Sequence, residues 1–286
     1  MTTPSLDPAG LVNEPRLRTV RARSGLAALD LRELLESREL VRAFVSRDLK
    51  VRYKQTVLGA AWAVLQPVAN TLVFSVIFGR LAHVPSGEVP YPLLALAGFV
   101  PWSYFSQSVT AASSSVADQR AMITKVYFPR VVLPLSPVLS GLLDLGVATA
   151  VLLGVAMFSG REPSVALLTV PLTFTALALT ALATGLWLSA LNALYRDFKF
   201  VVPFLVQLWL LASPVAYPSS LIPPAWRTVY FLNPLASWIE CVRAAVVGTP
   251  PPPLECIAAS SLVLLVAFFG GLIFFRQTEK TFMDSI

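Results

Sequence analysis

A stripe of aromatic rings and amides in the first long apolar stretch holds the residues best suited to contacting a ligand. Trp62, Gln66, Asn70, Phe74 and Phe78 recur every four residues, so on a helix they lie along one broad side. Amide groups are costly in contact with lipid, so this side should face protein or a cavity. Aromatic faces beside amides suit a sugar, which presents hydroxyl groups and an apolar ring face. Helix packing held together by the amides is the alternative.

A second stripe repeats this pattern more weakly in the fifth apolar stretch. It consists of Phe200, Phe204, Gln207 and Leu211. We interpret it in the same way, as a lining of aromatic faces with an amide, and the same packing alternative applies.

Asp144 is the one acid in the middle of an apolar stretch. Acids within a membrane are candidates for function, and a proton-coupled carrier would use one. We identify no basic residue or histidine at a matching depth, which weakens that interpretation. A role in helix packing is therefore favoured, and proton coupling is the alternative.

The motifs that enzymes and ATPases need are missing from the sequence. It has no G-x-x-x-x-G-K-[ST] phosphate loop, no Ser-His-Asp set and no His/Cys/carboxylate cluster. Cys241 and Cys256 are too few for a metal site, and they pair only if both lie on an oxidising face. We expect no catalytic residue, metal or cofactor on this chain. The energy for any uphill transport must come from another subunit or from an ion gradient.

The composition predicts an all-α integral membrane protein. Of the 286 residues, 56% are hydrophobic and 13% are charged, whereas an ordinary soluble domain has about 25% charged residues. A spanning helix needs about 20 mostly apolar residues. We predict six transmembrane helices, at residues 57–81, 92–116, 131–158, 165–194, 200–216 and 256–275.

The basic residues indicate how these spans are oriented. All but four of the 22 Lys and Arg residues fall on one side of the predicted topology, and the exceptions are Arg80, Arg161, Arg227 and Arg243. Because cytoplasmic loops carry the excess of Lys and Arg, both termini are expected in the cytoplasm. The net charge of +6 therefore follows the topology, and no nucleic-acid partner is expected.

Residues 213–248, between the fifth and sixth spans, are apolar but interrupted by five prolines. Irregular backbone at membrane depth is tolerated where it is buried in protein or lines a water-filled cavity. Glu240 and Arg243 are spaced to pair on one helical face. At an exposed site such a pair contributes on the order of 0.5 kcal/mol, but half-buried it would fix the geometry. We predict a re-entrant pair of short outer helices over residues 219–247, acting as the gate of a pathway.

Two N-terminal segments precede the first span. Residues 1–29 are polar and Arg-rich, and they predict a disordered basic cytoplasmic tail. Residues 30–46 have the periodicity of an amphipathic helix that lies in the membrane interface. The same helix could also present its polar face to a cytoplasmic partner.

The loop after the second span, residues 116–130, is too apolar for a plain connector. A short helix there would carry an apolar knob with basic flanks, which could dock into a groove of a partner. The alternative is an interfacial helix that touches only lipid. The side chains concerned are Arg120, Met122, Ile123, Lys125, Val126 and Tyr127.

Four stretches of the chain together match a known family. They are RDLKVRYKQTVLGAAWAVLQPV, GFVPWSYFSQSV, ITKVYFPRVVLPL and SPVAYPSSLIPPAWRTVYFLNPLASWIECVR, in this order. These stretches are spread between residues 47 and 243. Over nearly all of the chain after residue 30, the protein resembles the membrane-spanning subunit of type-2 ABC exporters. The resemblance is to the branch that exports O-antigen, capsule, teichoic acid and related glycans.

The resemblance implies an assembly and a substrate. Two copies of the chain, a homodimer, would form the channel, and two copies of a separate ABC ATPase would bind below it with ATP and Mg. The substrate would be a lipid-linked polysaccharide leaving the cytoplasm through a bacterial cytoplasmic (inner) membrane. Residues 30–286 would form the transmembrane domain.

The stripes and the resemblance together give three groups of expected site residues. The substrate channel would contain Trp62, Gln66, Asn70, Phe74, Trp102, Phe105, Phe204 and Gln207. The outer gate would contain Tyr217, Trp226, Arg227, Tyr230, Asn233, Pro234, Glu240 and Arg243. The contacts to the ATPase would come from Arg32, Glu36, Arg120, Met122, Ile123, Lys125, Tyr127, Arg196 and Asp197.

Other functions remain open at this point. An ABC exporter of small hydrophobic drugs or lipids would have the same architecture. An ion-coupled secondary transporter would instead depend on Asp144 and would have no ATPase partner. A membrane-embedded transferase acting on lipid-linked sugars is disfavoured, because no catalytic acid with a partner lies near either face.

Overall fold

The computed structural model describes residues 37–54, 61–126, 128–161, 164–195 and 197–279. All of them belong to one compact unit, Leu31–Ile286. Every regular element in these ranges is a helix, and none of these residues forms a strand. The helical class predicted from the sequence is confirmed.

The helices follow the apolar stretches of the sequence closely. The elements are α2 (Arg38–Tyr53), α3 (Trp62–Phe74) continued by the π-helical η3 (Ser75–Leu81), α4 (Tyr91–Asp118), α5 (Arg120–Ile123), α6 (Val132–Phe158), the 3-10 turn η4 (Val165–Thr169) leading into α7 (Val170–Leu194), α8 (Phe198–Leu211), the 3-10 turn η5 (Ser219–Leu221), α9 (Pro224–Tyr230), α10 (Pro234–Val247) and α11 (Leu254–Thr278).

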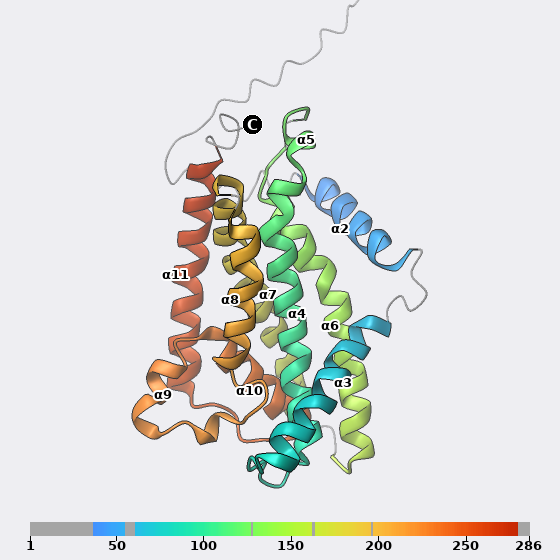
Figure 1. Ribbon diagram of the computed structural model, residues 1–286, viewed down its shortest axis with the longest axis vertical. Coiled ribbons are helices and arrows are strands. Elements are labelled where there is room, and N and C mark those ends of the chain that lie inside the picture. Colours follow the sequence, from blue (N-terminus) through green and yellow to red (C-terminus); the bar gives the residue numbers. More distant parts are fainter. Residues whose placement is uncertain (1–36, 55–60, 127, 162–163, 196, 280–286) are drawn as a thin grey trace, which may run out of the picture. The chain divides into compact units, whose positions relative to one another are not determined.

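Helix α4 is the centre of the unit, with α3, α6, α7 and α10 packed around it (Figure 1). Small residues allow the backbones to approach closely, as is common between helices in membranes. At Gly141 of α6, an added Cβ would lie only 2.9 Å from Ser108 Oγ of α4. Because α4 is enclosed by other helices, it can hold many serine and threonine side chains without exposing them to lipid.

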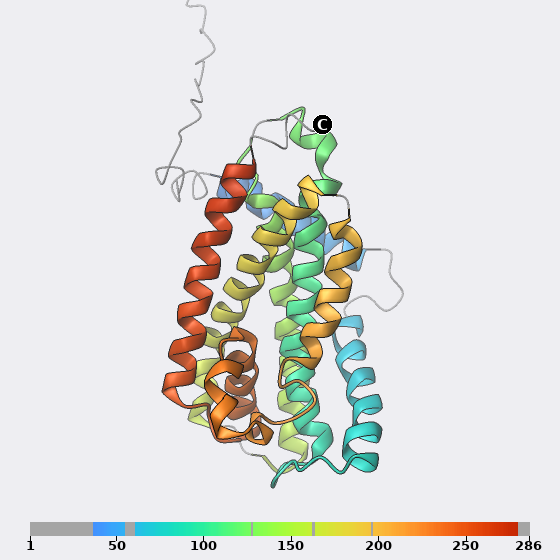
Figure 2. The same ribbon diagram turned by 60° about the vertical axis from the view of Figure 1, so that its left-hand side comes forward.

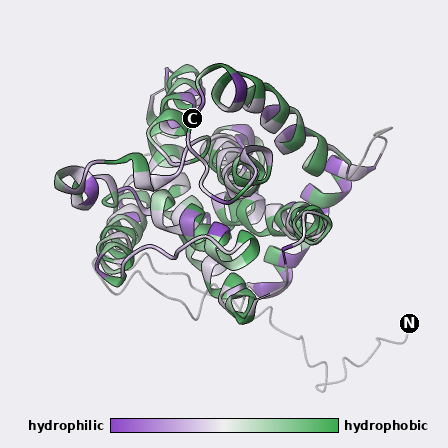
Figure 3. Cartoon of the chain, turned by 90° about the horizontal axis from the view of Figure 1, so that it is seen from below, coloured by the Kyte–Doolittle hydropathy of each residue, from purple (hydrophilic) through white to green (hydrophobic). Residues whose placement is uncertain are grey.

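Four helical segments are long and apolar enough to cross a membrane: Trp62–Leu81, Val132–Phe158, Val165–Leu194 and Leu254–Thr278. Helix α8 is apolar but has only 14 residues, and α4 has 28 residues but a more polar sequence. Figure 3 colours the helices by residue hydropathy, and most of their length is hydrophobic with fewer hydrophilic positions between. The described helices are those of a membrane protein, and the count of six spans stays a prediction.

Two predicted boundaries change in the structure. Helix α2 continues to Tyr53, beyond the predicted end at residue 46, because its last two turns place polar side chains against α6. Residues 30–36 and 57–60 of the predicted elements lie outside the described ranges. Helix α8 ends at Leu211 rather than at residue 216. Pro214 explains this early end, since proline removes a helical hydrogen bond.

The stretch between α8 and α11 contains two short helices, α9 and α10, at the end of the unit opposite α5 (Figure 1). Prolines begin both helices. Asn233 caps α10, because its side chain accepts a hydrogen bond from the Leu235 N–H at 3.2 Å. Gly248 ends α10 with a φ of 78°, a conformation that favours glycine. Figure 2 shows α9 lying below the lower ends of α8 and α11.

Candidate functional site

A groove of about 610 Å³ runs between α3 and α8, with α4 at its back. Its lining combines one indole, two amides, several hydroxyls and the ends of three charged or polar side chains. The residues of this groove are Arg52, Tyr53, Trp62, Ala63, Gln66, Ser106, Gln107, Thr110, Ala111, Ser114, Asp144, Pro203 and Val206. It is larger than a second cavity of about 420 Å³ elsewhere in the described part of the chain.

The polar groups of the groove are suited to ligands that carry hydroxyl groups. Gln107 donates a hydrogen bond to Gln66 across the groove, with Nε2 and Oε1 3.2 Å apart. The hydroxyl of Thr110 donates to the Ser106 carbonyl within α4 at 2.7 Å. A hydroxyl that donates in this way keeps lone pairs that can accept from a ligand. The groove therefore offers weak, repeated hydrogen bonding along its length rather than one tight site.

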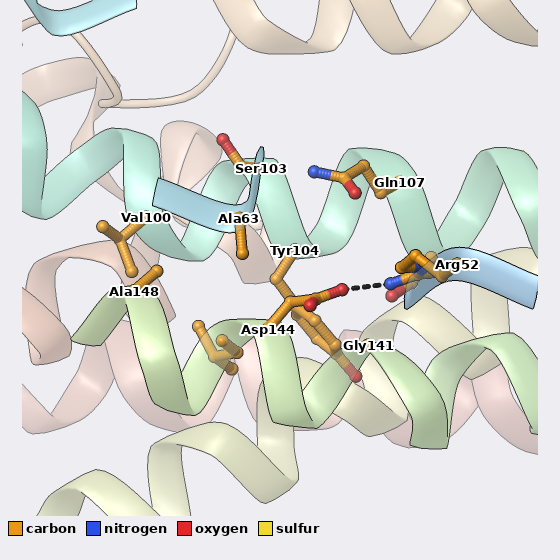
Figure 4. Close-up of a pocket in the computed structure, with 11 residues that line it drawn as sticks. Arg52, Ala63, Val100, Ser103, Tyr104, Gln107, Gly141, Asp144 and Ala148 are labelled. Carbon is orange, nitrogen blue, oxygen red and sulfur yellow. Dashed lines mark hydrogen bonds and ion pairs between the residues drawn. The ribbon is translucent and has the colours of Figure 1, made fainter. Parts of the chain in front are cut away.

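One end of the groove is closed by an ion pair between α2 and α6. Asp144 accepts hydrogen bonds from Arg52 and from the Tyr53 hydroxyl, as Figure 4 shows for the arginine. The expectation that Asp144 has no basic partner was wrong. The partner lies 92 residues away in sequence, on a helix that we predicted only to residue 46. Both members of the pair are partly buried, which supports the packing role of Asp144.

The same interface contains a second polar contact, in which Ser136 of α6 donates to Asp48 of α2. Two polar contacts one to two turns apart hold α2 in a defined register along α6. Helix α2 is therefore attached to α6 by specific hydrogen bonds, and its Phe44 ring is buried.

The predicted channel residues of α3 separate into two groups. Trp62 and Gln66 line the groove. Further along α3, Asn70 and Phe74 lie outside it, and Phe74 packs on Phe78 and Phe99 with ring centroids 5.4 and 5.0 Å apart. The start of the stripe, Trp62 and Gln66, therefore faces the groove, whereas Phe74 and Phe78 near its end pack against other rings of the protein.

The other predicted channel residues lie in different surroundings. Trp102 and Phe105 are buried in α4, and Phe105 packs edge-on against the indole of Trp209 at 5.2 Å. Phe204 and Gln207 are exposed on α8, beside the groove residues Pro203 and Val206. The sequence analysis missed Ser106, Gln107, Thr110 and Ser114 of α4. Their spacing of about four residues was the signal that could have identified them.

Arg243 is the centre of the predicted gate and is fully buried. Its guanidinium contacts the Glu240 carboxylate at 3.1 Å, so the predicted pair is present and is not an exposed one. The carboxylate also accepts from the backbone N–H of Ser219 at 2.8 Å. Three backbone carbonyls accept the remaining arginine hydrogen bonds, those of Leu94 (3.2 Å), Tyr217 (3.1 Å) and Val215 (2.6 Å).

This arrangement joins three elements that are far apart in sequence. Arg243 lies on α10, Leu94 on α4, and Val215 and Tyr217 on the turn that follows α8. Gly98 makes the approach possible, because a Cβ at that position would lie 2.2 Å from the Val215 carbonyl oxygen. We call Arg243, Glu240 and the groups bonded to them the arginine hub. It fixes the irregular backbone after α8 against the central helix.

The last residue of α9 contacts the hub, because the Tyr230 hydroxyl donates to the Tyr217 hydroxyl at 3.1 Å. Nearby, the Asn233 side chain at the start of α10 accepts from the Trp209 indole of α8 at 3.0 Å. Arg227 donates to the Ile222 carbonyl at 3.4 Å. Trp226 is 64% exposed. Pro234 is buried at the first turn of α10.

The predicted ATPase contacts that the structure describes lie at the opposite end, around α5 and the end of α7. Ile123 is buried and Met122 partly buried against their own chain, so the apolar side of α5 is largely covered. Arg120 donates to the Ala193 carbonyl at the end of α7 at 3.2 Å. Lys125 and Asp197 are exposed. Four further predicted contacts, Arg32, Glu36, Tyr127 and Arg196, lie outside the described residues.

The segment after α5 makes two contacts that the sequence analysis missed. Phe128 packs on Phe44 of α2 with ring centroids 5.9 Å apart. Arg130 pairs with Glu279 just after α11, with Nε and Oε1 3.6 Å apart. Together with Arg120, these contacts connect the α5 region to α2, α7 and α11.

The structure gives no candidate metal site among the residues it describes, where no three His, Cys, Asp or Glu side chains come together. Cys241 and Cys256 are both free thiols.

Comparison with known proteins gives a consistent set of matches. The family described as ABC-2 type transporter matches residues 39–247. The chain is 32% identical to the O-antigen export system permease protein RfbA of Myxococcus xanthus, over 90% of this chain and 98% of that protein. It is 30% identical to the RfbA protein of Klebsiella pneumoniae, over 86% and 94%. It is 25% identical to the polysialic acid transport protein KpsM of Escherichia coli, over 86% and 95%.

Proposed function

Because the chain belongs to the ABC-2 type transporter family, we propose that it is the permease of an ATP-driven exporter of a cell-envelope polysaccharide. It is the transport subunit and has no ATPase domain. ATP and Mg would be bound by a separate ATPase subunit. The substrate would be a lipid-linked glycan of the O-antigen, capsule or teichoic acid type, leaving the cytoplasm through a bacterial inner membrane.

The observation that carries the proposal is the lining of the groove. Relatives whose names refer to O-antigen and polysialic acid handle polymers of sugars. A polymer that must slide needs many weak contacts rather than one strong one. Trp62 supplies an apolar ring face, and Gln66, Gln107 and Thr110 supply amide and hydroxyl groups along one wall.

A second copy of the chain would complete the channel. Large apolar side chains are exposed on both sides of the groove, among them Trp62 and Leu72 of α3 and Phe204 and Leu211 of α8. Two such faces brought together in a homodimer would cover these side chains and enclose the groove. Six spans with both termini in the cytoplasm, and two ATPase copies on the α5 side, complete the proposed assembly.

A conformational change driven by ATP in the ATPase subunit would be transmitted to the groove through the α5 region. Contacts from this region extend to α2, α7 and α11, through Phe128, Arg120 and Arg130. Helix α2 in turn closes one end of the groove through the Arg52–Asp144 pair. ATP binding and hydrolysis would change the relative stability of open and closed states of the channel. At the far end, α9 would move against the arginine hub to open the exit.

The test is to change the groove without changing the assembly. Trp62→Ala and Gln66→Leu should each lower polysaccharide export about tenfold, equivalent to about 1.4 kcal/mol of lost interaction. Leu168→Ala, an exposed position of η4 outside the groove and outside the two faces of the proposed homodimer, is the control and should export normally. Export is measured as surface glycan in cells that lack the native permease.

Co-purification of the ATPase subunit must be unchanged in all three variants. Normal export in both groove variants would refute the assignment of the groove. Stimulation of the ATPase by small hydrophobic compounds, and not by lipid-linked glycan, would instead favour a drug or lipid exporter.

A further inference from the structure

A second cavity, separate from the groove, lies between α8 and α11 and has a volume of about 420 Å³. Residues of α7, of the end of α9 and of the start of α10 complete its lining. The lining is mostly apolar. The residues are Thr180, Ala183, Thr184, Trp209, Ala212, Val229, Tyr230, Leu232, Asn233, Pro234, Val263, Leu264 and Ala267.

The cavity exists because α8 is too short to follow its neighbours. With 14 residues, α8 is about 21 Å long, whereas the 25 residues of α7 or α11 extend over about 38 Å. A bilayer core is about 30 Å thick. The chain leaves the helical path at Leu211 and returns through α9 and α10, which leaves space beside α11.

The polar groups in the lining are already used by the protein. The side chains of Thr180, Thr184, Trp209, Tyr230 and Asn233 each donate a hydrogen bond to a protein acceptor at 2.8 to 3.1 Å. In addition, the Thr180 hydroxyl accepts from the Trp238 indole at 2.9 Å. These groups keep acceptor lone pairs, but the lining is mostly apolar and has no charged side chain, so the cavity suits water or sugar less than the groove does. Apolar cavities of this kind stay dry and take up apolar ligands.

The position of the cavity exposes it to hydrocarbon. Val263 and Ala267 lie near the midpoint of α11, and Thr180 and Thr184 near the midpoint of the segment Val165–Leu194, both of which qualify as membrane spans. Beside the mouth, large apolar side chains are exposed, such as Val266, which is 67% accessible. The surface around the opening is thus the type that contacts lipid chains.

Helix α9 is poorly packed, and an apolar ligand in the cavity would supply the contacts that it lacks. None of its seven residues is buried. Val229 is exposed and Tyr230 half-buried, and both border the cavity. An occupant would cover this side of α9 and so hold the helix against α11.

We propose that this cavity binds an acyl chain of a membrane phospholipid, which packs beneath α9 and supports it. If a methylene occupies about as much space as a water molecule, ~30 Å³, the cavity holds on the order of a dozen of them. That length corresponds to most of an ordinary acyl chain. The site is independent of the glycan substrate, and it is distinct from the groove.

The test uses photo-crosslinking of the complete transporter in nanodiscs. The only lipid present is a synthetic phospholipid with a diazirine in its acyl chain, and no glycan lipid is added. Labelled peptides should contain residues 229–234 and 263–267. Val263→Trp, which places an indole in the cavity, should remove most of this label, and Leu265→Trp, on the opposite side of the same helix, should keep it.

Ala267→Phe is a second filling variant for the case in which Val263→Trp does not fold, and it should also lose the label. Label that is unchanged in a folded filling variant would overturn the proposal. Absence of label from the cavity of the native transporter would also overturn it. That result would mean that only glycan lipid enters the cavity, or that a second copy of the chain covers it. Disulfide formation between subunits through Val229→Cys and Val263→Cys would reveal that second copy. Since the label is measured without transport, the result does not depend on whether the groove carries polysaccharide.

Discussion

Replacing Arg243 with methionine is the most direct test of the arginine hub. Methionine has a similar length and no charge, so the change removes the hydrogen bonds and keeps much of the apolar volume. It leaves the Glu240 carboxylate buried with only the Ser219 N–H as a partner that the structure shows. It also leaves the carbonyls of Leu94, Tyr217 and Val215 without their arginine donors.

The expected cost follows from the burial of this site. Removing one member of a buried, hydrogen-bonded ion pair destabilises a protein by about 3–5 kcal/mol. The matched control is Arg161→Met, because Arg161 makes a hydrogen bond to the Glu88 carbonyl at 2.7 Å from a more exposed position. That change should cost about 1 kcal/mol.

The double variant Glu240→Leu/Arg243→Met separates the charge from the rest of the hub. Once both charges are gone, no unpaired charge remains buried, so the double variant should be more stable than Arg243→Met alone. The two single changes should therefore be non-additive by about 2 kcal/mol.

Equilibrium unfolding in mixed detergent micelles, followed by tryptophan fluorescence, gives the required free energies. A loss below about 1 kcal/mol for Arg243→Met, equal to the loss in the control, would refute the reasoning. Additive effects of the two hub changes would show that the pair is not energetically coupled.

Three further predictions use other contacts. Gly98→Ala should destabilise the same unfolding transition by about 2–3 kcal/mol, because its Cβ would lie 2.2 Å from the Val215 carbonyl oxygen; an unchanged midpoint would argue against the close approach. Asp144→Asn should lower stability by about 1–3 kcal/mol through the weakened contact with Arg52, and ATP-driven export should fall only in part, because asparagine can still accept a hydrogen bond from Arg52. Complete loss of export from a stable, ATPase-bound Asn variant would favour proton coupling. Gly248→Val should cost about 1–2 kcal/mol, since φ is 78° at the end of α10, and thermal unfolding should show it.

Several features of this protein could be predicted from local patterns alone. Helices and their apolar character follow from composition and periodicity, which depend only on neighbouring residues. The pairing of Glu240 with Arg243 could be predicted for the same reason, because three residues bring both side chains to one face of any helix. The stripe that begins with Trp62 and Gln66 was identifiable from its spacing.

Only the tertiary structure decided which of these residues face a cavity and which face protein. Phe105 has the same residue type as the exposed Phe204, yet it is fully buried, because α4 lies at the centre of the unit. Asp144 pairs with a residue of α2 that is 92 residues away in sequence. Arg130 bonds to a residue just after α11 that is 149 residues away.

Such contacts depend on how helices pack, and periodicity within one helix carries no information about the neighbour it will meet. The same reason accounts for the depth of Arg243, because the sequence left open whether its pair with Glu240 is exposed or half-buried. The i,i+3 spacing was enough to predict its pair with Glu240, but three carbonyls from two distant elements are what keep the guanidinium buried.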